Sequence, residues 1–205
     1  MNYTNTWGTE VIDIALTYAN HEWYAAENNV KHGLDLYNNM VDTPDVTWTG
    51  KELHCGWWKV NELNKGIPYS WGGASTIEEF DRGLLNGKYA GNVPEDKSRH
   101  GSYDCVGIDC SGLLSVCWKL PNRVTTRDIP NIANRIETPE DIRKGDILAK
   151  LGNHVMLFVG FSRDEKDTAI IIDSTRSTGK VSLREVNMKV LFHNGYGMYR
   201  KFDFI

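Results

Sequence analysis

The sequence lacks the features that mark membrane-spanning and nucleic-acid-binding proteins. No apolar run approaches the roughly 20 residues that are needed to cross a bilayer. The 205 residues include 23 Lys and Arg against 27 Asp and Glu, which gives a net charge of −4. Proteins that bind DNA or RNA usually carry a basic stripe or a strongly basic domain instead. We therefore expect no transmembrane segment and no nucleic-acid partner.

Cysteine is also scarce, and its spacing is not that of a metal site. The chain has four cysteines, and the four residues between Cys105 and Cys110 are more than the two of the usual CxxC corner of a zinc site. We expect no metal site and an all-thiol state as the default. A pairing of Cys55 with Cys105 stays open if the protein is exported. Cys117 reads as a small core residue.

No internal repeat, low-complexity tract or long linker divides the chain, so we treat residues 1–205 as a single domain. After Gly145, short apolar runs alternate with polar turns, which predicts an antiparallel meander. The runs cover residues 147–150, 154–161, 168–173, 180–186 and 196–204. Because the helical patterns precede the strand patterns, we expect an α+β fold with N-terminal helices packed on a C-terminal antiparallel sheet of about five or six strands.

Residues 1–56 are expected to form a helical N-terminal segment. Apolar residues at helical spacing predict an amphipathic helix over about residues 10–28, with Thr9 as its N-cap. A second helical piece is expected over residues 30–40, and a further helix over residues 57–66. Five tryptophans make this half aromatic, which suggests either a sugar-binding surface or a filled core, and packing favours the core. They are Trp7, Trp23, Trp48, Trp57 and Trp58.

Cys110 lies at the start of an apolar helix. Cys110, Leu113, Leu114 and Cys117 recur at i, i+3, i+4 and i+7, which predicts one buried face. A helix start carries unpaired N–H groups and a positive partial charge, so a sulfur there is stabilised as the thiolate, the form that attacks carbonyls. Cys105 lacks such a helix. Cys110 is therefore the candidate nucleophile.

A nucleophilic thiol needs a base, and His154 is the best candidate because it opens an apolar strand and can face a cleft. His193 is a rival, although its Asn-Gly neighbours predict a turn. Asp173 lies at the polar end of the next strand, where its carboxylate can orient the imidazole. The alternative role for Asp173 is to cap the turn that follows it.

Four motifs around these residues resemble, in order, those of the NlpC-like cell-wall peptidases. They are Tyr69-Ser70-Trp71-Gly72-Gly73, Asp109-Cys110-Ser111-Gly112, Lys144-Gly145-Asp146-Ile147-Leu148, and His154-Val155 with Phe158-Val159-Gly160. The resemblance covers about residues 57–200. It implies a papain-like core, in which the Cys-bearing helix packs on an antiparallel sheet that supplies the His and a third polar residue.

The resemblance also implies an activity. It is the hydrolysis of amide bonds in peptidoglycan stem peptides, commonly between D-glutamate and a diamino acid, through a thioester and without metal or cofactor. Cys110 takes the place of the nucleophile and His154 that of the base, and Asp173 lies near the third polar position, which is often His in relatives. The candidate substrate-binding residues are Tyr69, Trp71, Asp109 and Ser111, of which Tyr69 and Asp109 match positions that can hold a free amino group. The expected partner is the stem peptide, and the chain is expected to be a monomer.

The chain departs from the family pattern by an insert at residues 74–104, where relatives often have a handful of residues. Ser75 and Glu78 form a capping box, which predicts that the insert begins with a short helix. Its apolar face would hold Ile77, Phe80 and Leu84. Residues 86–104 are rich in Gly, Asn, Lys and Glu, and we expect a loop over or beside the cleft.

The first residues show no basic, apolar and small-residue signal pattern. For a cell-wall hydrolase we therefore expect an extracytoplasmic or secreted location that is reached after removal of a leader, by phage lysis or through a dedicated secretion system. Two other functions remain open. One is a related amidase or acyl-transfer enzyme that acts on another amide or ester, and the other is a non-catalytic cell-wall binding module whose aromatic half holds glycan.

Overall fold

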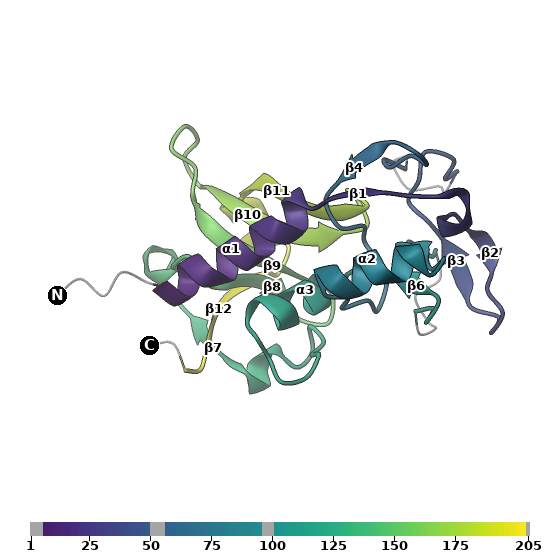
Figure 1. Cartoon of the computed structure of the whole chain (residues 1–205). Helices are drawn as coiled ribbons and strands as arrows, with labels where there is room; N and C mark the ends of the chain where they lie inside the picture. Colours follow the sequence, from purple (N-terminus) through teal and green to yellow (C-terminus); the bar gives the residue numbers. More distant parts are fainter. Residues whose placement is uncertain (1–5, 50–55, 96–100, 204–205) are drawn as a thin grey trace.

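A six-stranded antiparallel sheet is the main element of the fold in the computed structural model, which describes residues 6–49, 56–95 and 101–203 (Figure 1). Its strand order is β11-β10-β9-β8-β12-β7. The strands are β7 (Ala133–Ile136), β8 (Ile147–Lys150), β9 (His154–Phe161), β10 (Thr168–Thr175), β11 (Lys180–Asn187) and β12 (Gly197–Lys201). The expected α+β class and the run of neighbouring strands from β8 to β11 are confirmed. The unpredicted β7 forms the far edge, and β12 inserts between β7 and β8.

Helices lie on both faces of this sheet. α1 (Thr6–Asn20) and α3 (Cys110–Cys117) contact each other and the strands β9, β10 and β11 on one face (Figure 1). Because side chains alternate along a strand, Val155 and Leu157 of β9 join the core under these helices, while Met156 and Phe158 face the opposite side. There they share a second apolar cluster with residues of α4 (Met188–His193). The sheet thus separates two cores.

The N-terminal segment is less helical than the sequence pattern predicted. α1 ends at Asn20 rather than near residue 28, and it starts before the expected cap at Thr9. The chain continues as β1 (Glu22–Tyr24), which pairs antiparallel with β4 (Leu63–Lys65). This pairing buries Trp23, and its indole N–H donates to the Gly66 carbonyl at 2.9 Å. The helix predicted over residues 57–66 is therefore wrong, because these residues supply the partner strand.

Residues 30–40 form most of a hairpin and not a second helical piece. β2 (His32–Leu34) pairs with β3 (Met40–Asp42). The Asp35 carboxylate accepts the backbone N–H groups of Tyr37 and Asn39, both at 2.8 Å, and Asn38 takes a left-handed φ of 62°. A side chain that bonds its own following backbone competes with helix formation and favours a turn. The second helical piece predicted over residues 30–40 is therefore wrong.

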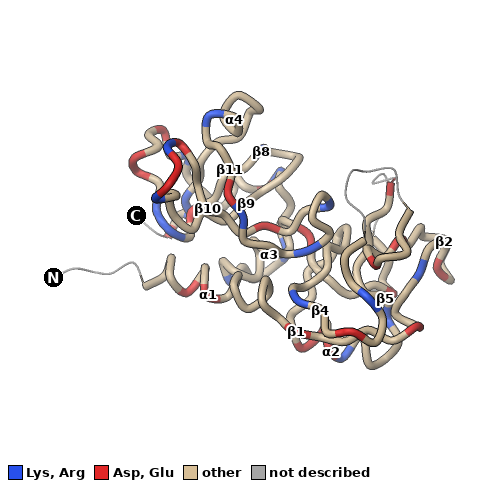
Figure 2. Tube along the Cα trace, turned by 90° about the horizontal axis from the view of Figure 1, so that it is seen from above, with Lys and Arg blue, Asp and Glu red and all other residues tan. Residues whose placement is uncertain are grey.

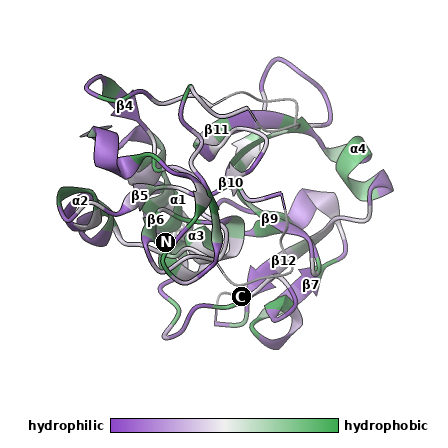
Figure 3. Ribbon diagram, turned by 90° about the vertical axis from the view of Figure 1, so that its right-hand side faces the viewer, coloured by the Kyte–Doolittle hydropathy of each residue, from purple (hydrophilic) through white to green (hydrophobic). Residues whose placement is uncertain are grey.

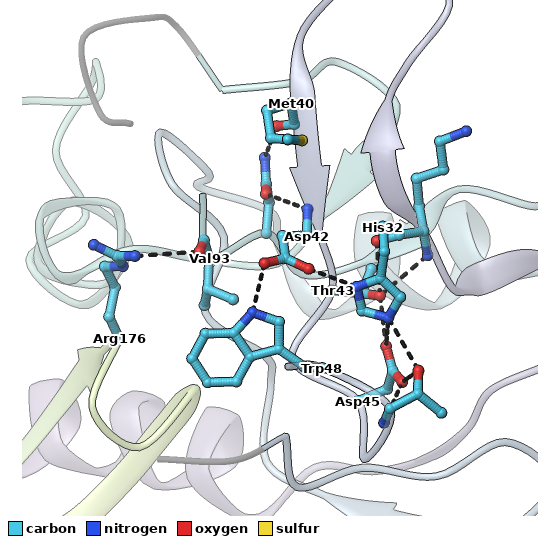
Figure 4. Close-up of polar contacts among 11 residues, drawn as sticks. His32, Met40, Asp42, Thr43, Asp45, Trp48, Val93 and Arg176 are labelled. Atoms are coloured by element: carbon cyan, nitrogen blue, oxygen red, sulfur yellow. Dashed lines mark hydrogen bonds and ion pairs between the residues drawn. The ribbon is translucent and has the colours of Figure 1, made fainter. Parts of the chain in front are cut away.

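A polar cluster holds this hairpin to the segment that follows it. Figure 4 shows His32 between two carboxylates, with Nδ1 2.5 Å from Asp42 Oδ1 and Nε2 3.0 Å from Asp45 Oδ2. The indole of Trp48 donates to the other oxygen of Asp42. Trp48 is buried with Tyr69 and Val93, so the segment packs on the first of the four motifs.

The five N-terminal tryptophans mostly fill the interior, as packing suggested. Trp23, Trp48 and Trp58 are buried, while Trp7 and Trp57 are partly buried against the main core. Trp23 makes edge contacts with Trp57, Trp58 and Phe80. A continuous sugar-binding surface of these rings is therefore not present.

The insert begins with α2 (Ile77–Leu85), as expected, but its capping box lies one residue later than predicted. Thr76 Oγ1 accepts from the Glu79 N–H at 3.1 Å, and Glu79 Oε2 accepts from the Thr76 N–H at 2.9 Å. The hydroxyl of Ser75 instead accepts from the Gly107 N–H at 3.2 Å. Phe80 and Leu84 are buried, which confirms the predicted face. α2 accordingly shows both apolar and polar colours in Figure 3.

Short elements complete the fold. β5 (Tyr89–Ala90) pairs in parallel with β6 (Cys105–Val106). The middle of the insert therefore lies beside the residues that directly follow it, and residues 89–90 of the expected loop form a short strand. The 3₁₀ turns are η1 (Glu27–Asn29), η2 (Ile129–Asn131) and η3 (Pro139–Asp141).

Basic and acidic residues are interspersed along the described trace (Figure 2). None of the helices in the described ranges has the length and apolar character that crossing a membrane requires.

Candidate active site

Cys110 is the first residue of α3, and the helix begins there because Asp109 caps it. Asp109 is extended, with φ −93° and ψ −179°, and its Oδ1 accepts from the Gly112 N–H at 2.7 Å. Leu113, Leu114 and Cys117 are buried as predicted, whereas Cys110 is partly exposed. The N–H of a first helical residue has no acceptor within its own helix. Cys110 is therefore a partly exposed thiol at the start of a helix.

The residues just before Cys110 are fixed to the sheet. The Ser174 hydroxyl on β10 donates to the Ile108 carbonyl at 2.7 Å, and both groups are buried. The Ile108 N–H donates to the Pro68 carbonyl at 3.1 Å. Gly107 has a φ of +146°, and a Cβ there would lie 2.5 Å from the same carbonyl, so only glycine fits. These contacts set the distance between Cys110 and β10.

His154 is the first residue of β9, where the sequence pattern placed it. Its Nε2 lies 2.7 Å from Asp173 Oδ2, which leaves Nδ1 as the nitrogen available to Cys110. Burial alone would lower the pKa of His154, but the hydrogen bonds to Asp173 and Cys110 and the charges of both raise it to about 9. The imidazole is therefore protonated at neutral pH between a sulfur and a carboxylate.

Asp173 lies within β10 rather than at its end, opposite Ser182 of β11. Its side chain is completely buried. Burial would raise the pKa of Asp173, but hydrogen bonds and charge from His154 and Arg184 lower it below its ordinary value. Both carboxylate oxygens bond these two side chains and not the turn after the strand. The structure thus brings together Cys110, His154 and Asp173, the three residues that the sequence pattern had selected.

Arg184 is a site residue that the sequence analysis missed. Its Nε donates to Asp173 Oδ1 at 3.0 Å and its Nη2 to Asp173 Oδ2 at 2.6 Å, a two-pronged ion pair. The alternation of β11 was visible in the sequence, but its register was not. Only the pairing of Asp173 with Ser182 shows that Arg184, two residues further along, lies on the same face as Asp173.

Asp109 and Ser111, two expected substrate-binding residues, are buried and already bonded within the protein. Besides Gly112, Asp109 accepts from the Gly72 N–H at 3.0 Å, the Ser111 hydroxyl at 3.0 Å and Arg123 Nη2 at 2.5 Å. Its carboxylate therefore holds the first motif, the start of α3 and Arg123 in one arrangement. We expect Asp109 to act by positioning Cys110 through these contacts.

Replacing Asp109 with alanine should lower the free energy of unfolding by about 2 kcal/mol, because a helix cap and a buried acceptor are lost together. Chemical denaturation of both proteins measures this change. Thr76→Ala removes the cap of α2 and is the matched control, with an expected cost of about 1 kcal/mol. Labelling of Cys110 should slow in the first variant only. Equal labelling rates in the two variants would contradict the positioning role of Asp109.

Tyr69 and Trp71 are the other expected substrate-binding residues, and Tyr69 lies beside the segment that leads into α3. Tyr69 forms an isolated bridge with Ile108 and is buried. Burial, and then the nearby charges of Asp109 and Cys110, raise the pKa of the Tyr69 phenol well above its ordinary value. The hydroxyl consequently keeps its proton and can donate a hydrogen bond. Trp71 is partly buried and packs against the cluster of Trp48, Tyr69 and Val93.

The alternative nucleophiles and base are placed less favourably. Burial raises the pKa of the Cys105 thiol to about 12 and that of the Cys117 thiol further still. His193 is exposed at the end of α4. Cys105, Cys110 and Cys117 are free thiols, and Cys55, the suggested partner of Cys105, lies outside the described residues.

The arrangement has the components of covalent acyl chemistry, namely a thiol at a helix start, an imidazole that contacts it and a buried carboxylate behind the imidazole. Within residues 6–49, 56–95 and 101–203, no group of three or more His, Cys, Asp or Glu side chains could hold a metal ion. No family model, curated protein or solved structure matches the chain.

Proposed function

We propose that the protein is a cysteine peptidase of the NlpC-like type, with a papain-like core, that hydrolyses amide bonds in peptidoglycan stem peptides. The observation that carries the proposal is the line of contacts from Cys110 through His154 to the buried Asp173. The ordered motifs around these residues supply the choice of substrate, because they resemble those of cell-wall peptidases. A location outside the cytoplasm follows from that substrate.

The proposed reaction has two stages. The Cys110 thiolate attacks the amide carbonyl carbon, and the oxyanion that forms accepts from the Cys110 backbone N–H at the start of α3. Protonated His154 gives its proton to the leaving amine, the C–N bond breaks, and a thioester remains. Neutral His154 then takes a proton from water, and the hydroxide attacks the thioester. The sulfur leaves as thiolate, His154 is again protonated, and a carboxylic acid is released.

A non-catalytic binding module is the less suitable alternative. A protein that only holds glycan gains nothing from a protonated imidazole placed between a partly exposed sulfur and a buried carboxylate. Its aromatic surface would also have to be exposed, whereas Trp23, Trp48 and Trp58 are buried. The same triad serves amidases and acyl-transfer enzymes, so product identity must separate these from a peptidase.

Digestion of defined muropeptides tests the proposal. The wild-type protein should cut the stem between D-glutamate and the diamino acid, and the two products should together exceed the substrate mass by one water. Mass spectrometry of a time course measures both the site and the rate. A panel of small amides and esters, assayed in parallel, is the control. Turnover of that panel with no cut in any muropeptide or in purified sacculi would overturn the substrate assignment.

A further inference from the structure

The carboxylate behind His154 has a second partner. Arg184 approaches Asp173 from β11, on the other side from β9, and its two nitrogens bond the two carboxylate oxygens at 3.0 and 2.6 Å. A planar guanidinium matches a carboxylate in this two-pronged geometry, which fixes the orientation of both groups. The Asp173 oxygen that bonds His154 Nε2 is the same one that accepts from Arg184 Nη2. The rotation of the Asp173 carboxyl is therefore determined from both sides.

The charge of Arg184 also affects Asp173. The Asp173 side chain is completely buried, and a buried carboxylate with too few partners takes up a proton instead of staying charged. His154 can supply one N–H to it, and Arg184 supplies two more together with a permanent positive charge. With a thiolate at Cys110 and a protonated His154, the four groups sum to zero charge, so none of them is left uncompensated.

We propose that Arg184 is a positioning residue, which keeps Asp173 ionised and turned toward His154 so that the Cys110–His154 pair stays reactive in mild acid. The inference rests on the proposed function only in taking Cys110 and His154 as the reactive pair. Arg184 needs no contact with substrate to do this. It acts through the carboxylate alone.

The other groups around Asp173 do not replace Arg184. Tyr196, which precedes β12, is near Asp173, Arg184 and Cys110, but burial and the charge of Asp173 raise the pKa of its phenol, so it adds no charge at neutral pH. Met156 on β9 offers Arg184 only a sulfur, 3.7 Å from Nη2. The positive charges that lower the pKa of Asp173 are those of His154 and Arg184.

The test compares three variants by the rate at which iodoacetamide alkylates Cys110 across pH, followed for each cysteine by peptide mass spectrometry. Arg184→Met removes charge and hydrogen bonds, and Arg184→Lys restores the charge. Arg200→Met is the matched control, because Arg200 makes the same two-pronged pair with buried Asp146, at 3.0 and 2.7 Å. Asp146 directly precedes β8, whereas Lys150, the last residue of β8, is the one that pairs with His154. The Arg200–Asp146 pair therefore lies at the end of β8 away from His154.

In Arg184→Met, Asp173 should take up a proton at a higher pH than in the wild type, and His154 then loses the charge that keeps it protonated. Alkylation of Cys110 near pH 6 should fall about tenfold. Arg184→Lys should recover most of that rate, and Arg200→Met should keep the wild-type profile even where it lowers stability.

Three results would overturn the proposal. The first is an Arg184→Met protein whose Cys110 alkylation profile coincides with that of the wild type or shows faster labelling in acid. The second is a shift of the alkylation profile in Arg200→Met that equals the shift in Arg184→Met. The third is a wild-type Cys110 that is alkylated no faster than an ordinary thiol. The assay needs no substrate. If the expected shift is seen and no muropeptide is cut, the role of Arg184 stands and the substrate assignment falls.

Discussion

Replacing Cys110 with alanine is expected to abolish cleavage of stem peptides. In the proposed reaction the thiolate forms the covalent intermediate, so its removal should lower the rate by about four orders of magnitude. The fold should persist, because Cys110 is partly exposed and loses little buried surface. We expect the free energy of unfolding to change by less than about 1 kcal/mol. A mass-spectrometric time course on muropeptides measures the activity, and denaturant titration measures the stability.

Cys117→Ala is the matched control for this experiment, since it makes the same atomic change at the other end of α3. Cys117 is fully buried, so the variant should lose stability, by about 1 kcal/mol, and keep most of its activity. The two variants thus separate chemistry from packing on one helix. A Cys110→Ala protein that digests muropeptides at the wild-type rate would rule out the nucleophile assignment.

The parts of this site that could be predicted from the sequence are those that depend on local patterns. The helical spacing of Cys110, Leu113, Leu114 and Cys117 identified α3, and the apolar runs that contain His154 and Asp173 identified β9 and β10. Consecutive strands joined by short turns usually pair, which brings the two polar residues together. Local signals were therefore sufficient for the three central residues.

The parts that failed depend on pairing and on side-chain hydrogen bonds. Asp35 turns the chain into a hairpin by accepting two backbone N–H groups, and nothing in the apolar spacing of residues 30–40 records this. Residues 63–65 become a strand only because β1 lies beside them. Arg184 required the register of β11 against β10. In each case the deciding partner is a specific atom or a distant segment, which periodicity does not encode.

Asp109 shows what a short motif does not contain. Its place directly before Cys110 was visible in the sequence. The structure adds that Gly72, Ser111, Gly112 and Arg123 all donate to its two oxygens. A carboxylate with four protein donors and almost no exposed surface has little capacity left for a substrate amine. Arg123, 14 residues further along, was the partner that the motif could not reveal.

Replacing His154 with glutamine should lower stem-peptide cleavage by about three orders of magnitude, because both proton transfers of the proposed reaction lose their carrier. The amide can still donate to Asp173, and Arg184 still neutralises that carboxylate, so the protein should fold. His193→Gln is the control, since His193 is exposed at the end of α4, and it should keep full activity. Equal losses in the two variants would mean that His154 acts only through the fold.

The pH dependence tests the same residue in the wild-type protein. The pKa of His154 is raised from 6.5 to about 9, so the free energy that its protonation adds to the folded state is fully present below about pH 6.5 and is lost as the pH rises through about 9. Activity and stability should therefore both decline over that interval. In His154→Gln this shared decline should disappear from the stability profile. A wild-type protein whose stability is constant from pH 6 to 10 would show that His154 is not held as the imidazolium, and the ion-pair mechanism would then fail.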